Sequence, residues 1–141
     1  MKSWKIIVII LLLQVITSSV TCKKGHGDDR LTVVNNSNKS IYVILQYNYP
    51  DTSINDESWT YLAYNYLQVD SNSSKNLWNS LDWEKVIRDK NASNTMMVFV
   101  FDLNNVINKP WMQIQADYDV LKRYDVTIDQ LNALNWKVTY P

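Results

Sequence analysis

Hydrophobic and polar positions alternate with a period of two in several segments of the chain, which predicts β-strands. The clearest alternation covers residues 40–49, where Ile41, Val43 and Leu45 share one face. The same type of pattern is found at residues 31–35, 64–69 and 136–140. Only a polar cluster separates the first two strands in the chain, so we expect these two strands to pair as a β-hairpin.

Apolar residues recur at three- and four-residue spacing in other segments, and this period predicts helices. Residues 77–89 show it, with Ser80 or Asp82 as the N-cap and Glu84 and Arg88 as an ion pair one turn apart. Residues 70–75 before it are expected to form a polar loop. Further helical segments are expected at 102–107, 111–124 and 128–134.

Two of the later helical segments carry additional signals. In the segment 111–124, Tyr118 and Lys122 also fit a strand. In the segment 128–134, Thr127 and Gln130 have the spacing of a capping box, and we expect Leu131 and Leu134 to be buried.

Residues 95–101 are apolar on both faces of an extended chain, which predicts a central strand covered on both sides. Asp102 follows this strand, and we expect it to cap a turn of helix. The end of a buried strand is also a common place for a catalytic carboxylate, and Asp82 or Glu84 would be its partner in a two-carboxylate hydrolase. We favour the capping role.

Strands and helices that do not alternate strictly predict an α+β fold. We expect a single small domain over residues 31–141, with a mainly antiparallel sheet of four to five strands and two to three short helices. The chain has two Gly and 16 Asn. Asn is therefore expected to occupy the left-handed turn positions that Gly usually takes.

The N-terminal 21 residues have the pattern of a secretory signal peptide. Two lysines precede an apolar run over residues 6–16, which only Gln14 interrupts. A membrane-spanning helix needs about 20 apolar residues, so this run is too short to span.

The only cysteine, Cys22, follows directly and has no partner for an internal disulfide. Its position resembles a bacterial lipoprotein signal, which implies lipid attachment at Cys22 and a flexible tether over residues 22–30. Ordinary signal cleavage near this point and an uncleaved anchor are the alternatives.

All Gly, His and Cys residues lie between positions 22 and 27. The folded part therefore lacks the residues for a His/Cys zinc site, a Cys or His nucleophile, a Ser-His-Asp triad or a Gly-rich phosphate loop. We expect no enzyme activity, no cofactor and no metal. Removing Lys2 and Lys5 with the signal leaves 14 − 2 = 12 basic residues against 14 acidic ones. No basic patch stands out, so we expect no nucleic-acid partner.

Aromatic residues are the best candidates for ligand binding. Trp59, Tyr61, Tyr64 and Tyr66 lie in one short segment, where an exposed row of rings would stack on sugars or bind a protein. Core packing of the same rings is the alternative that we favour. Six acidic residues that could offer oxygen ligands to Ca²⁺ lack the spacing of an EF-hand and are expected to be solvated. They are Asp28, Asp29, Asp51, Asp56, Glu57 and Asp70.

Several motifs of the folded part resemble those of small uncharacterised lipoproteins of Gram-negative gut anaerobes (Bacteroides-type). They are the hairpin-like segment 34–47, YPD (49–51), MVFVFD (97–102), DYDVLKRYDVT (117–127), DQL (129–131) and NWKVTYP (135–141). The family has no known activity. The resemblance implies an outer-membrane lipoprotein, periplasmic or surface-facing, and it bears on location and fold only.

These observations favour a non-catalytic, lipid-anchored cell-envelope protein that acts as a binding or structural module. Its expected partners are the membrane, through the lipid anchor, and a glycan or an envelope protein. The alternatives are a glycan-binding surface module that uses the exposed aromatics and an envelope-held inhibitor or immunity-type protein.

Overall fold

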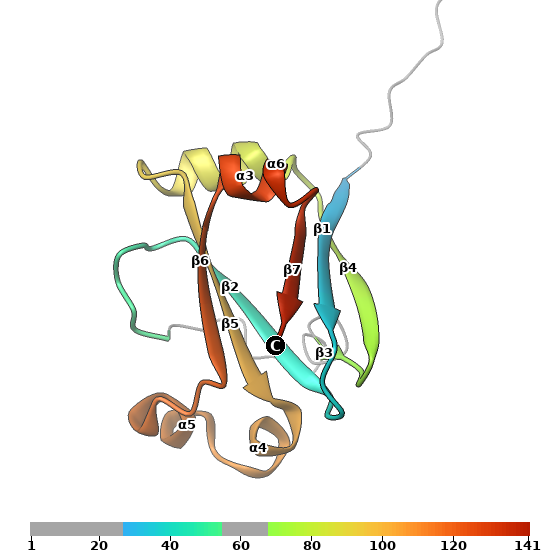
Figure 1. Cartoon of the computed structure of the whole chain (residues 1–141). Coiled ribbons are helices and arrows are strands. Elements are labelled where there is room, and N and C mark those ends of the chain that lie inside the picture. The colour runs from blue at the N-terminus through green and yellow to red at the C-terminus, as the bar shows by residue number, and fades with distance from the viewer. Residues whose placement is uncertain (1–26, 55–67) are drawn as a thin grey trace, which may run out of the picture.

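The computed structural model describes residues 27–54 and 68–141, and within these ranges seven strands and four helices form an α+β domain (Figure 1). The α+β class predicted from the sequence is confirmed, although these residues form two sheets instead of one. The elements are β1 (Asp28–Asn35), β2 (Ile41–Gln46), β3 (Gln68–Val69), β4 (Ser73–Asn79), α3 (Trp83–Lys90), β5 (Thr95–Asp102), α4 (Leu103–Asn108), α5 (Trp111–Asp117), β6 (Lys122–Thr127), α6 (Ile128–Ala133) and β7 (Lys137–Tyr140).

The strands form a three-stranded sheet in the order β4-β1-β7 and a four-stranded sheet in the order β3-β2-β5-β6. The pairings are antiparallel except that of β1 with β7, which is parallel. Helices α3 and α6 lie at one end of the two sheets and α4 and α5 at the other (Figure 1).

The predicted hairpin of the first two strands is wrong, because β1 and β2 belong to different sheets. The buried side chain of Asn35 holds the corner between them. Its amide nitrogen donates to the carbonyl oxygens of Lys39, Val69 and Asp70 at 2.7, 3.2 and 2.9 Å. The separation lets both strands cover the same core, since Leu31 of β1 and residues of β2 join one apolar cluster.

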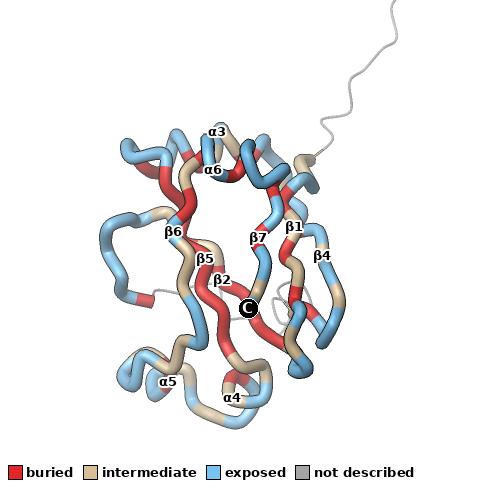
Figure 2. Tube along the Cα trace, in the orientation of Figure 1, coloured by how far each residue is buried: buried red, intermediate tan, exposed pale blue. Residues whose placement is uncertain are grey.

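The core has two parts, one on each face of the four-stranded sheet. One part lies between the sheets and includes Met96, Val98 and Val100 of β5. The other lies against α4 and α5 and includes Phe99 and Phe101. Strand β5 is buried from Thr95 to Phe101 (Figure 2), so the prediction of a central strand covered on both sides is confirmed.

The helix predicted over 77–89 begins only at Trp83, and the loop predicted over 70–75 is partly strand, because β4 covers residues 73–79. Leu77 pairs with Leu31 of β1, so tertiary pairing overrides the helical spacing. The predicted cap and ion pair are confirmed. Asp82 accepts from the backbone N–H of Lys85 at 3.1 Å, and Arg88 contacts Glu84 at 3.3 Å.

The helix predicted over 111–124 is right as far as Asp117 and wrong beyond it. Tyr118 adopts a left-handed conformation with φ 48° and ends α5, and β6 begins at Lys122 as the strand alternative allowed. The capping box of Thr127 is present. Leu131 is buried as predicted, but Leu134 lies beyond the last turn and is 52% exposed.

Strand β1 begins at Asp28, three residues before the predicted start of the domain at residue 31. The prediction of a tether that extends to Arg30 is therefore wrong at its end. The use of Asn in left-handed turns is confirmed, since Asn72, Asn94 and Asn135 have φ values of 51°, 53° and 51°.

Candidate functional site

Five sequence-predicted site residues lie outside the part of the chain that the structure describes. They are Cys22, Trp59, Tyr61, Tyr64 and Tyr66. The lipid attachment and the aromatic ligand site therefore stay predictions.

Asp102 sits where β5 passes into α4, at the end of the molecule where α4 and α5 lie (Figure 1). One carboxylate oxygen accepts a hydrogen bond from the backbone N–H of Asn104 at 2.9 Å. The other accepts from the ammonium group of Lys39 at 3.1 Å. The prediction that Asp102 caps a turn of helix is confirmed.

The environment of Asp102 favours its charged form. Partial burial raises the pKa of this carboxyl, whereas the hydrogen bonds from Lys39 and from the N–H of Asn104 lower it. The lowering outweighs the effect of burial, so the net pKa lies below 3.8. A general acid needs a raised pKa so that it keeps its proton near neutral pH. The lowered pKa of Asp102 therefore agrees with its role as the cap of α4.

The pairing of Asp102 with Asp82 or Glu84 as acid and base is wrong. Asp82 and Glu84 lie at the α3 end, and the eight residues of β5 separate this end from Asp102 by about 25 Å. Glycoside hydrolysis needs two carboxylates about 5–10 Å apart. The described carboxylates that the sequence suggested for this chemistry do not share a site.

A pocket of about 420 Å³ opens beside Asp102 at the end of the molecule where α4 lies. Its lining combines the Lys39–Asp102 ion pair with the apolar side chain of Ile107, which is 61% exposed. The full lining is Lys39, Ser40, Asp102, Leu103, Asn104 and Ile107. Sequence reasoning missed this pocket, because the turn residue Lys39 reaches it only through the pairing of Ile41 with Asp102.

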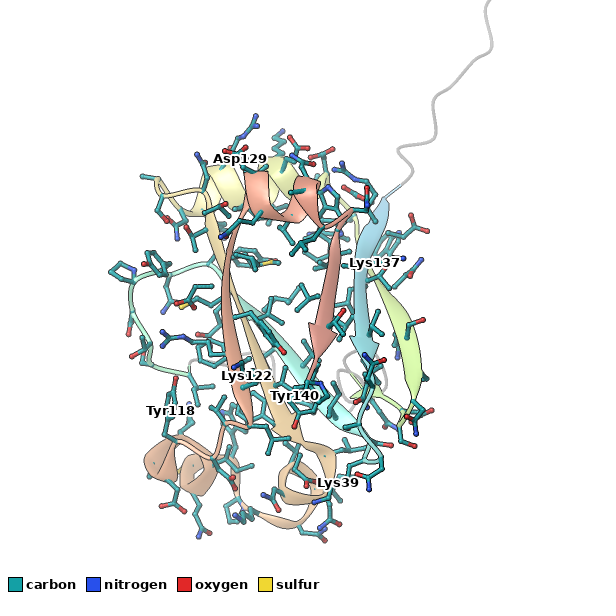
Figure 3. The ribbon with its side chains drawn as sticks, in the orientation of Figure 1. Lys39, Tyr118, Lys122, Asp129, Lys137 and Tyr140 are labelled. Atoms are coloured by element: carbon teal, nitrogen blue, oxygen red, sulfur yellow. The ribbon has the colours of Figure 1, made fainter. Side chains whose placement is uncertain are left out.

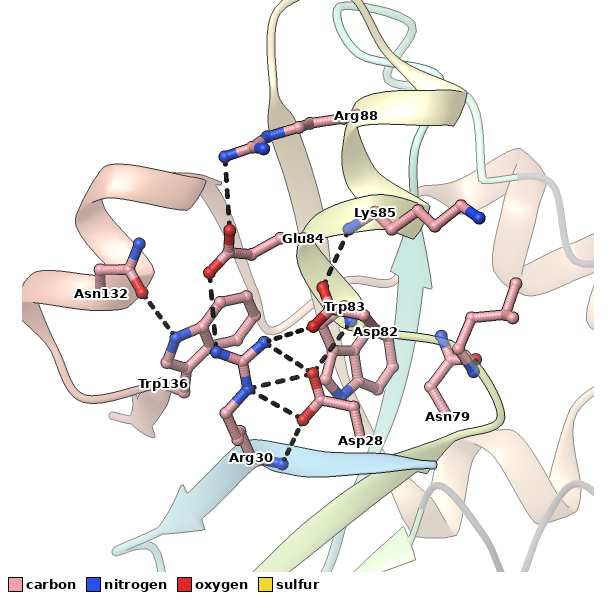
Figure 4. A network of polar contacts seen from close by, with 11 residues as sticks. Asp28, Arg30, Asn79, Asp82, Trp83, Glu84, Lys85, Arg88, Asn132 and Trp136 are labelled. Carbon is pink, nitrogen blue, oxygen red and sulfur yellow. Dashed lines mark hydrogen bonds and ion pairs between the residues drawn. The ribbon is translucent and has the colours of Figure 1, made fainter. Parts of the chain in front are cut away.

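A polar network ties β1 to α3 at the opposite end of the domain (Figure 4). The guanidinium group of Arg30 forms a bidentate pair with Asp28, with the shortest contact at 2.7 Å. It also contacts the carboxylates of Asp82 at 3.3 Å and Glu84 at 3.6 Å. Asp28 in turn accepts from the backbone N–H of Trp83 at 3.0 Å, at the first turn of α3.

Arg30 also links β1 to the segment after α6. Its guanidinium lies 4.4 Å from the ring centroid of Trp136, whose indole N–H donates to Asn132. Partial burial raises the pKa of Asp28, but the hydrogen bonds from Arg30 and Trp83 outweigh it and the net pKa is lowered. The network joins three segments of the chain. No sequence motif indicates that positions 30, 82 and 136 are close in space.

The acidic residues weighed as Ca²⁺ ligands are spread over the molecule. Asp28 pairs with Arg30, Asp51 accepts from the N–H of Ser53, and Asp70 accepts from Gln68. Asp56 and Glu57 lie outside the described residues. Within the ranges 27–54 and 68–141, no three His, Cys, Asp or Glu residues gather around a possible ion position.

None of the helices in the described ranges combines the length and the apolar composition that crossing a bilayer requires. Comparisons of the chain with family models, with curated proteins and with solved structures found no match.

Proposed function

We propose that the protein is a lipid-anchored cell-envelope module, held by a lipid at Cys22, that acts by binding or as a structural element and not by catalysis. The observation that carries this proposal is the position of Cys22. It is the only cysteine, it follows an apolar run too short to span a bilayer, and it precedes the first strand by six residues.

The polar contacts of the domain support a role without catalysis. Two carboxylates are engaged in holding the fold, since Asp102 caps a helix and Asp28 ties β1 to α3. The lowered pKa of each carboxyl agrees with a charged group that accepts hydrogen bonds within the fold.

The test compares the wild-type chain with Cys22→Ala in a bacterial host that processes lipoproteins. We expect wild type in the membrane fraction, with an N-terminal peptide whose mass includes acyl chains, and Cys22→Ala in the soluble fraction. Lys24→Ala, two residues further on, is the matched control and should fractionate as wild type does. Unchanged membrane association of Cys22→Ala, together with an unmodified wild-type peptide, would reject the anchor.

Glycan binding is a second candidate function, carried by the four aromatic residues Trp59, Tyr61, Tyr64 and Tyr66 within eight positions. A glycan array with the wild-type chain tests it. We expect any specific signal to be lost in Trp59→Ala and Tyr64→Ala and kept in Trp78→Ala, an aromatic variant elsewhere in the chain. An array without signal would reject this candidate.

A further inference from the structure

Three apolar side chains are exposed at the end of the domain where β1 begins. Trp78, Leu81 and Leu134 expose 53%, 53% and 52% of their surface, and we call them the proximal patch. The topology brings them to one end. Strand β4 runs antiparallel to β1 and ends there, and β7 runs parallel to β1, so Leu134 just before β7 lies there too (Figure 1).

Trp78 lies directly against the point where the described chain begins. A Cβ atom added to Gly27 would come within 2.4 Å of the indole nitrogen of Trp78 and within 2.2 Å of the carbonyl oxygen of Asn79. Only a residue without a side chain fits this approach. The indole therefore sits beside the exit of the segment that leads to Cys22.

The length of that segment limits how far the patch can stand from the anchor. Gly27 lies five positions after Cys22, and a fully extended chain spans at most about 18 Å over five positions. Strand β5 alone is about 25 Å long. A lipid at Cys22 therefore keeps the proximal patch near the bilayer, whereas the exposed Ile107 and Met112 lie at the opposite end of the domain.

The chemistry of the patch suits a lipid headgroup region. Tryptophan combines a large apolar ring with a polar N–H and is enriched at membrane–water interfaces. Three carboxylates at this end, those of Asp28, Asp82 and Glu84, contact Arg30, which reduces the repulsion that they would exert on lipid phosphates. Asp129 of α6 also lies at this end (Figure 3).

We propose that the proximal patch is a membrane-contact surface. Trp78, Leu81 and Leu134 dock on the phospholipid headgroups of the bilayer that holds the Cys22 lipid, and this inference rests on the proposed anchor. Docking in this orientation turns the pocket beside Asp102 away from the membrane.

The test measures tryptophan fluorescence of the full chain purified from membranes and reconstituted into phosphatidylcholine vesicles whose acyl chains are brominated near the headgroup. If mass spectrometry shows that the Cys22 thiol is free, the thiol is coupled to a maleimide phospholipid in the vesicle. The domain is then anchored at residue 22 whether or not the cell attaches a lipid there. We expect quenching in wild type and its loss for the most part in Trp78→Phe. Trp111→Phe, at the α5 end, is the matched control and should keep the wild-type quenching.

A second variant moves the reporter within the patch. Leu81→Trp in the Trp78→Phe background should restore the quenching, and circular dichroism checks that each variant is folded. Undiminished quenching in Trp78→Phe, or loss in Trp111→Phe instead, would overturn the membrane-contact surface. A free thiol at Cys22 in the purified chain counts against the anchor alone, because chemical coupling still tests the contact.

Discussion

The carboxylate of Asp102 binds a backbone N–H and a lysine side chain at the same time. One oxygen caps the first turn of α4, and the other pairs with Lys39 from the turn before β2. The side chain of Asp102 is 13% exposed, whereas that of Lys39 is 69% exposed. Asp102 therefore contributes more to stability than Lys39, because its partly buried carboxylate also caps α4.

Replacement of Asp102 by Ala removes the cap and the ion pair together. We expect the free energy of unfolding at pH 7 to fall by about 1–2 kcal/mol, as for other lost N-caps. Urea denaturation followed by circular dichroism measures the change. Lys39→Ala is the control and should cost less, because it leaves the cap in place and removes only an exposed charge.

The same pair of proteins also tests the lowered pKa of Asp102. A carboxyl with a lower pKa in the folded state than its ordinary 3.8 adds stability above that pH, and the gain disappears as the pH falls through the folded value. The stability difference between wild type and Asp102→Ala should therefore shrink as the pH is lowered below about 4. A difference that grows towards acid would contradict the assignment.

Asn94 has a φ of 53° in the turn between α3 and β5, where its backbone carbonyl also accepts from the N–H of Ile128. Asn94→Gly should be tolerated, and Asn94→Ala should cost about 1 kcal/mol because a Cβ disfavours the left-handed region. Thermal unfolding of the two variants checks the order. Equal melting temperatures of the two variants would contradict this prediction, because they would mean that the turn accepts a Cβ atom at position 94 without cost.

At the scale of elements, the Arg30 network fixes α3 to the first strand without covalent help. The planar guanidinium donates three hydrogen bonds to the two carboxylate oxygens of Asp28 and covers the ring of Trp136, and a lysine ammonium cannot reproduce this geometry. The Arg30 side chain is 42% exposed, so solvent weakens each ion pair.

Arg30→Lys should lower the free energy of unfolding by about 1 kcal/mol, after allowance for solvent screening. The deficit should shrink in about 1 M salt, where charge interactions are screened within a few ångströms. Denaturant unfolding at low and high salt measures both effects. Arg88→Lys, in a single exposed pair with Glu84, is the control and should change stability little.

The elements that the sequence predicted well are those with a strong local signal. Strand β5 is apolar throughout, and α6 has its capping box, so both appear where expected. The prediction for residues 73–79 failed because these residues form a strand by pairing with β1, which is far away in the sequence. The pocket beside Asp102 and the Arg30 network were missed for the same reason, since each joins residues more than 50 positions apart.

At the scale of the whole molecule, each sheet has two edge strands within the described residues, β4 and β7 in one sheet and β3 and β6 in the other. A side chain links two of these edges, β6 and β7. The hydroxyl of Tyr124 on β6 donates to the carbonyl oxygen of Thr139 on β7 at 2.7 Å and joins the two edges. Charged residues flank these edges, including Lys122 and Lys137 (Figure 3), and such charges discourage pairing with another chain.

Tyr124→Phe removes this link and leaves the ring in place. We expect a loss of about 1 kcal/mol in the free energy of unfolding, the usual net worth of one hydrogen bond. Thermal unfolding gives the measurement. Tyr118→Phe loses only a long 3.5 Å contact with Arg123 and serves as the control. A larger loss in Tyr118→Phe would contradict the bridging role of Tyr124.

The parallel pairing of β1 with β7 has a consequence for how the chain acquires its structure. The first and last strands of the domain are hydrogen-bonded neighbours, with Thr32 opposite Lys137 and Asn35 opposite Tyr140. Thr32 and Lys137 lie more than 100 positions apart, so this pairing must close a long loop before it can stabilise the three-stranded sheet. Because non-local pairing slows folding, we expect the β1–β7 contact to form late, after the local helices and the antiparallel pair of β5 and β6.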